Sequence, residues 1–217
     1  MHIRQTKGLT LMELLLASIL ISIVIAGVVA ISYAIKSMQD TTNRASVVAI
    51  RTTAAMSHMI KNISLAIGWQ GDPGIRFVPQ WDWEGGASPP ADPDVISVRE
   101  DINHTPEDYT DDTWFTYVRD TTDHTLVFCA QAANGNPDQG WDPRVSGQEC
   151  DTTTGMILSN QIINCQFRLY IDTSQTDPQF HVAVILETRY DPSQASNPIS
   201  NPETVLESKV NPAAHSW

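Results

Sequence analysis

Residue types that commonly do chemistry are present in this chain, but few of them stand in a pattern that a reaction needs. The six histidines show no pairing with a nucleophile, and the sequence contains neither a G-x-S-x-G nor an H-E-x-x-H motif. Acidic side chains gather near residues 92–94, 107–112 and 138–142, without EF-hand spacing, which indicates solvated surface rather than calcium sites. We therefore predict a protein that is not an enzyme and that holds no cofactor or metal.

The three cysteines, Cys129, Cys150 and Cys165, leave three single disulfide pairs open. Their spacing contains no CxxC or CxxxH, which argues against a zinc site. Cys165 lies on the apolar face of an alternating segment, and this position favours a small buried thiol. We predict a disulfide between Cys129 and Cys150, because it closes a segment rich in Gly, Asn and Pro that has little apolar content to fold on.

One acid stands out by its position. Glu13 immediately precedes residues 14–35, a run of 22 residues without a charged side chain. About 20 helical residues cross a bilayer core of roughly 30 Å, and a lone carboxylate buried there costs about 2.5–3.5 kcal/mol on insertion scales. Arg4 and Lys7 precede the run, which predicts a single-pass anchor with its N-terminus in the cytoplasm and its C-terminal part outside.

The same helix is predicted to continue beyond the apolar run. Lys36, Asp40 and Arg44 follow at intervals of four residues, which suits a solvated helical face. An apolar stripe at three- to four-residue spacing then runs as far as Ile67, and Gly68 follows as a C-cap. This pattern predicts a helix over residues 10–67, with an amphipathic part in 36–68 that packs on the domain behind it.

Residues 69–217 are of a different kind. The formal charge is +4 over residues 1–68 and −16 over residues 69–217, which gives the total of −12. A nucleic-acid partner is not expected, because nucleic-acid binding requires a basic surface. Alternating apolar residues predict strands at 94–99, 114–119, 124–130, 161–172 and 181–190, with a short last strand at 205–210. The expected fold class is α+β, with a long N-terminal helix, half transmembrane and half amphipathic, packed on an antiparallel β-sheet domain.

The segment from Lys7 to Glu13, Lys-Gly-Leu-Thr-Leu-Met-Glu, resembles the N-terminus of type IV pilins and type II secretion pseudopilins. The resemblance covers about residues 4–35. It implies a prepilin leader at residues 1–8, cleavage by prepilin peptidase between Gly8 and Leu9, and N-methylation of Leu9. The transmembrane and assembly helix is then 9–35, and the extracytoplasmic pilin domain is 69–217.

The resemblance also implies a role for Glu13, which becomes the fifth residue of the mature chain. In the family this carboxylate pairs with the N-terminal ammonium of a neighbouring subunit in the fibre. Two positions depart from the usual pattern, because Leu9 replaces the common Phe and Ala30 replaces the helix-breaking Pro of many major pilins. The second departure favours a minor pilin or pseudopilin.

A more diffuse resemblance joins the chain to W-type minor pilins and J-type pseudopilins. It consists of Ala-Ile-Gly-Trp at 66–69, the strand at 94–99 and the late pair 156–172 and 182–188. The implied function is a minor pilin-like structural subunit that helps to initiate or assemble a type IV pilus. Its partners would be other minor and major pilins or pseudopilins, prepilin peptidase and the inner-membrane assembly platform. A J-type minor pseudopilin is the alternative, and a membrane-tethered binding domain or enzyme is the alternative from another class.

Overall fold

The computed structural model describes residues 10–68, 74–78, 94–105, 108–137, 139–140, 142–143, 147, 149–172 and 179–212. The chain divides into two compact units, Met1–Asn43 and Arg44–Trp217. The division falls inside the long helix and not near Gly68, where composition and charge change. Helical residues from Arg44 onward therefore belong with the strands.

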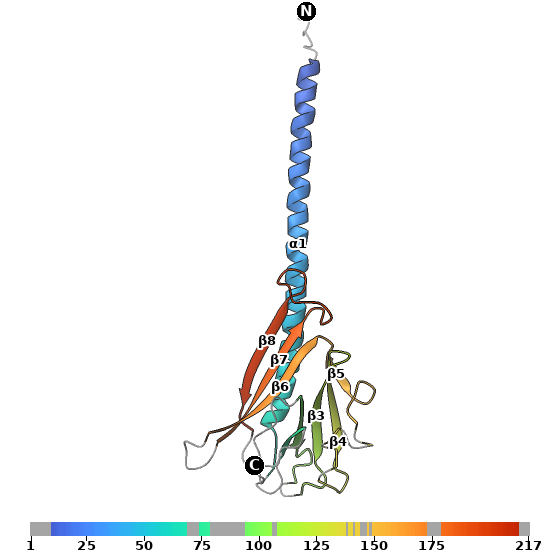
Figure 1. Ribbon diagram of the computed structural model, residues 1–217, viewed down its shortest axis with the longest axis vertical. Helices are drawn as coiled ribbons and strands as arrows, with labels where there is room; N and C mark the ends of the chain where they lie inside the picture. The colour runs from blue at the N-terminus through green and yellow to red at the C-terminus, as the bar shows by residue number, and fades with distance from the viewer. Residues whose placement is uncertain are drawn as a thin grey trace, which may run out of the picture. The chain divides into compact units, whose positions relative to one another are not determined.

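Helix α1 spans Leu11–Ser64 and begins directly after Thr10 (Figure 1). It ends three residues before the predicted end at Ile67. The amides of Leu65 and Ala66 each bond a carbonyl only three residues back, which tightens the last turn. The amide of Ile67 then bonds the carbonyl of Arg99 on a strand, at 3.0 Å. A strand carbonyl thus replaces the partner that a longer helix would have supplied.

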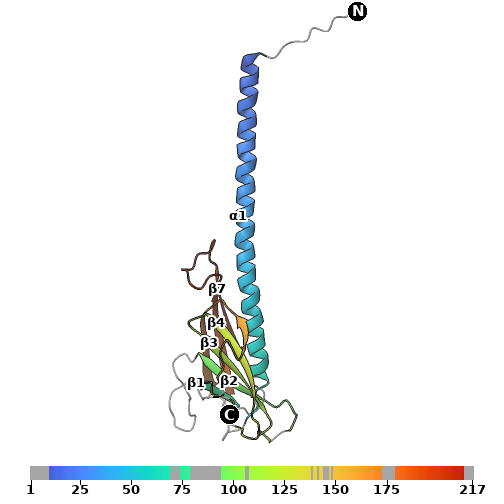
Figure 2. The ribbon, with the colours of Figure 1, turned by 90° about the vertical axis from the view of Figure 1, so that its right-hand side faces the viewer.

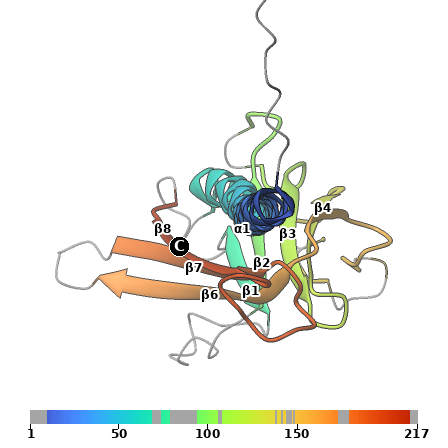
Figure 3. The ribbon, with the colours of Figure 1, turned by 90° about the horizontal axis from the view of Figure 1, so that it is seen from above.

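The helical segment of the second unit buries one stripe. Its buried residues recur at three- to four-residue spacing, as the amphipathic pattern predicted; they are Val48, Thr52, Ala55, Met56, Met59, Asn62 and Ile63. Figures 2 and 3 show the strands on one side of this segment. The predicted α+β architecture, a long helix packed on antiparallel sheet, is confirmed.

The described strands form two antiparallel sheets rather than one. The five-stranded sheet has the order β1-β2-β3-β4-β5, and the three-stranded sheet has the order β6-β7-β8. The first sheet contains β1 Ile75–Val78, β2 Val95–Glu100, β3 Thr113–Asp120, β4 Thr125–Ala132 and β5 Met156–Ser159. The second contains β6 Ile162–Asp172, β7 Gln179–Arg189 and β8 Glu203–Val210.

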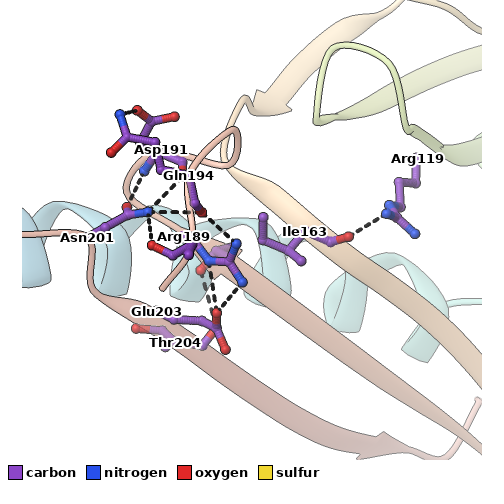
Figure 4. Close-up of polar contacts among 10 residues, drawn as sticks. Arg119, Ile163, Arg189, Asp191, Gln194, Asn201, Glu203 and Thr204 are labelled. Carbon is purple, nitrogen blue, oxygen red and sulfur yellow. Dashed lines mark hydrogen bonds and ion pairs between the residues drawn. The ribbon is translucent and has the colours of Figure 1, made fainter. Parts of the chain in front are cut away.

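The main apolar core lies between the helical segment of the second unit and both sheets. Met59 and Ile63 of α1 share this core with Tyr117 from the first sheet. Phe167 and Val184 from the second sheet belong to the same core, and none of the five residues has exposed surface. The sheets are also joined directly. The guanidinium of Arg119 on β3 donates to the backbone carbonyl of Ile163 on β6 (Figure 4).

The connection between β7 and β8 is an ordered loop held by one asparagine. The Asn201 amide donates to the carbonyls of Asp191, Gln194 and Ala195 at 2.9, 3.2 and 3.0 Å (Figure 4). At its base, Arg189 binds Glu203 through both Nε and Nη2. The asparagine thus supplies a hydrogen-bond donor to three loop carbonyls that have no strand partner.

Candidate functional site

Glu13 lies in the first turn of α1 and forms a reciprocal cap with Thr10. The backbone amide and the hydroxyl of Thr10 donate to Oε2 of Glu13 at 2.9 and 3.0 Å. In return, the amide of Glu13 donates to Oγ1 of Thr10 at 3.3 Å. This is a capping box, in which two otherwise unpaired amides at a helix start receive side-chain acceptors.

The cap fixes the carboxylate in place and leaves part of it open. Both donated bonds end on Oε2, and among the described residues no donor reaches Oε1. The positive end of the helix macrodipole favours a negative charge in this turn. Glu13 is therefore oriented along the helix start with one oxygen ready for a further cationic donor.

Behind Glu13, the side chains of the apolar run are exposed. Leu14, Val24 and Ile31 are exposed by 64%, 64% and 63%. Two hydroxyls within the run bond backwards along the helix: Ser18 donates to the carbonyl of Leu15 and Ser22 to that of Ser18, both at 2.8 Å. By length and composition this helix is able to span a membrane, where polar groups must find partners inside the chain.

The sequence predictions for this region are only partly covered by the structure. Gly8 and Leu9, the residues of the proposed cleavage and methylation, lie outside the described residues. Glu13 is at the start of the exposed apolar helix, as its sequence position indicates. Sequence reasoning missed Thr10 as the partner of Glu13, although a Thr followed three residues later by a Glu is the spacing of a capping box.

The cysteines form the predicted pair. Cys129 and Cys150 are joined by a disulfide across a sequence separation of 21. Cys165 is a buried free thiol in the main core. Burial raises the pKa of Cys165 to about 12, which keeps it protonated and unreactive at neutral pH.

The acidic loop between β2 and β3 binds its own backbone and hydroxyls. Asp101 accepts from the amide of Thr105 at 3.0 Å, and Asp108 accepts from the hydroxyl of Thr110 at 2.6 Å. Within the described ranges, no three His, Cys, Asp or Glu side chains come together in a group that could hold a metal ion.

A polar cluster closes the end of α1 against β3. The hydroxyl of Tyr117 receives the Asn62 amide at 2.8 Å and lies 2.9 Å from Nδ1 of His58. Glu100 on β2 lies nearby, and its Oε1 is buried without a hydrogen-bond donor from any described residue. Burial raises the pKa of Glu100 to about 7, against a smaller opposing effect of Lys61.

We expect Glu100 to make the folded protein less stable at alkaline pH. Its pKa is higher when folded than when unfolded, so its stabilising effect is complete at acidic pH and is lost as pH rises through about 7. At pH 8, Glu100→Gln should raise the free energy of unfolding by about 1 kcal/mol, which is less than the full pKa shift would give because the site is partly solvated. At pH 4.5 the substitution should change the free energy of unfolding little. Urea unfolding at both pH values tests this; an equal effect at the two pH values would contradict it.

No protein-family model, curated protein or solved structure matches this chain.

Proposed function

We propose that this chain is a minor pilin-like structural subunit that helps to initiate or assemble a type IV pilus. The observation that carries the proposal is the capped carboxylate of Glu13 at the start of one 54-residue helix. The first part of this helix exposes apolar side chains all round, and the buried side chains of its last part contribute to the core of an α+β unit. A subunit that leaves a bilayer and enters a fibre needs both properties in one element.

The mechanism is assembly rather than catalysis. The apolar part of α1 holds the subunit in the inner membrane and then packs beside the helices of neighbouring subunits. Inside such a bundle, an unpaired carboxylate is costly, and only a nearby opposite charge offsets that cost. The N-terminal ammonium of a neighbour can meet Oε1 of Glu13 while Thr10 holds Oε2, which makes the ion pair a device that sets the register of the helices.

The disulfide and the flanking charges support the orientation of the chain. Arg4 and Lys7 lie before the apolar helix, which favours a cytoplasmic N-terminus. The Cys129–Cys150 disulfide suits an oxidising compartment outside the cytoplasm. After extraction from the membrane, the C-terminal unit would belong to the pilus or pseudopilus.

Two other functions remain as alternatives. A J-type minor pseudopilin shares the same features, and a deletion strain separates the two: loss of pili with normal secretion favours the pilus, and the reverse favours the secretion system. A membrane-tethered binding domain or enzyme would need neither processing nor Glu13. In the resembling family the topmost pseudopilin lacks this acid, so we expect this chain, which has Glu13, to lie beneath another minor subunit.

Replacing Glu13 tests the proposal. Glu13→Ala should leave membrane insertion intact, because it removes a charge next to an apolar run, and should lower co-purification with the other minor pilins at least tenfold. Glu13→Gln keeps a side-chain acceptor for Thr10 and loses the charge, so it should be equally defective. Asp40→Ala, which removes another exposed acid of the same helix, is the matched control and should behave as wild type. Unchanged recovery of Glu13→Ala would reduce Glu13 to an interfacial carboxylate.

A further inference from the structure

The sequence contains two Asn-x-Ser/Thr tripeptides in which the middle residue is not proline, the acceptor pattern for N-linked glycans. One is Asn62-Ile63-Ser64 and the other is Asn103-His104-Thr105. A sequon alone is a common accident, so the two must be judged by their surroundings. The structure places them in opposite environments.

The first sequon is closed to any enzyme. Asn62 lies within α1 with 7% of its surface exposed. Its amide donates to the hydroxyl of Tyr117 at 2.8 Å, inside the polar cluster at the helix end. A glycan on this nitrogen would displace the packing between α1 and β3.

The second sequon is open. Asn103, His104 and Thr105 are all exposed in the loop between β2 and β3, and Ile102 beside them is 52% exposed. Among the described residues, the amide of Asn103 bonds acceptors of one neighbour, the carbonyl and Oδ2 of Asp111, at 3.2 and 3.3 Å. An amide nitrogen carries two hydrogens, so one can be replaced while the other keeps this contact.

The loop also gives the tripeptide a turned shape. His104 has a φ of 58°, in the left-handed region, and the amide of Thr105 bonds Oδ1 of Asp101 at 3.0 Å. The Thr105 hydroxyl donates to the Asp111 carboxylate at 3.0 Å, the same side chain that the Asn103 amide reaches. The side-chain amide of Asn103 and the hydroxyl of Thr105 thus lie on the same side of the chain, where one enzyme can contact both.

We propose that Asn103 is an N-glycosylation site, which the outward placement of the C-terminal unit exposes to an oligosaccharyltransferase. The donor is an oligosaccharide on a polyprenyl diphosphate. The Asn103 nitrogen forms the new bond to C1 of the first sugar, the bond from C1 to the diphosphate oxygen breaks, and the lipid diphosphate leaves with the electron pair. The amide gives up one proton to the transferase. A glycan here extends from a loop into solvent and disturbs no core contact.

Mass spectrometry of the full chain purified from its own host tests the proposal. Trypsin cuts after Arg99 and Arg119 and also after Lys61 and Arg76, so the two sequons fall on separate peptides, 100–119 and 62–76. We expect glycan mass on Asn103 in the first peptide and an unmodified second peptide. Pro106 restricts the backbone of Thr105, so occupancy should be partial in the wild type and at least twofold higher in Pro106→Ala.

Three variants define the acceptor. Asn103→Gln and Thr105→Val should each abolish the modification, while Thr105→Ser, which keeps the hydroxyl, should retain it. An unmodified peptide 100–119 in both the wild type and Pro106→Ala overturns the proposal. The redox state of Cys129 and Cys150 in the same sample then shows why Asn103 is unmodified. If the two cysteines are joined, the C-terminal unit is outside the cytoplasm and Asn103 is not an acceptor. If both are reduced, the C-terminal unit is not in an oxidising compartment, and its proposed placement outside the cytoplasm is wrong.

Discussion

Simultaneous replacement of Cys129 and Cys150 by alanine is expected to lower the free energy of unfolding by about 3 kcal/mol, the value that chain-entropy models give for a closure of about 20 residues. The two cysteines are separated by 21 positions, and the described residues between them contribute little to the main core. The disulfide instead forms a small cluster with Val127 and Val118. Without the bond, this small cluster loses the covalent link between β4 and the segment that returns at Cys150.

The side chains and backbone around the disulfide are closely packed, so its loss should also disturb its neighbours. A Cβ atom added to Gly155 would come within 2.6 Å of Sγ of Cys129 and 2.8 Å of the carbonyl of Phe128, so the chain packs tightly on the bond. The buried Trp114 also lies against the closed segment, because its Nε1 donates to the carbonyl of Pro137 at 2.8 Å. Loss of the disulfide should therefore loosen the packing around a tryptophan.

Urea unfolding of the full chain in detergent, followed by circular dichroism and tryptophan fluorescence, measures the effect. Cys165→Ala is the matched control, since it removes a buried sulfur that has no covalent partner, and should cost only about 1 kcal/mol. Equal midpoints for the double variant and wild type would show that the disulfide does not stabilise the fold.

Long periodic segments were predictable from sequence because their burial is itself periodic. The amphipathic part of α1, the hairpin of β3 and β4, and the antiparallel pair of β6 and β7 all follow from regular spacing of apolar residues. Strands β1 and β5 were missed as separate strands, because four residues are too few to show an alternation. The sequence also did not reveal that the strands form two sheets, since this depends on which edges pair.

The candidate site was also only partly predictable from the sequence. The charge pattern alone located Glu13, because one acid next to 22 uncharged residues is visible in any sequence. The bond to Thr10 needed the helix start to be known to the residue, which periodicity does not supply. Asn201 is similar: its amide reaches three carbonyls only after the loop between β7 and β8 has folded around it.

The mature N-terminus is the most direct test of the central claim, that this chain is processed and assembled as a pilin-like subunit. Mass spectrometry of the protein from its host membranes should find a chain that begins at Leu9 and carries one methyl group on its amino nitrogen. In Gly8→Glu, a side chain stands where the peptidase must approach the backbone, so only the full-length precursor should remain in the membrane. A wild-type chain that keeps residues 1–8, or a Gly8→Glu variant still cut at Leu9, would contradict the account.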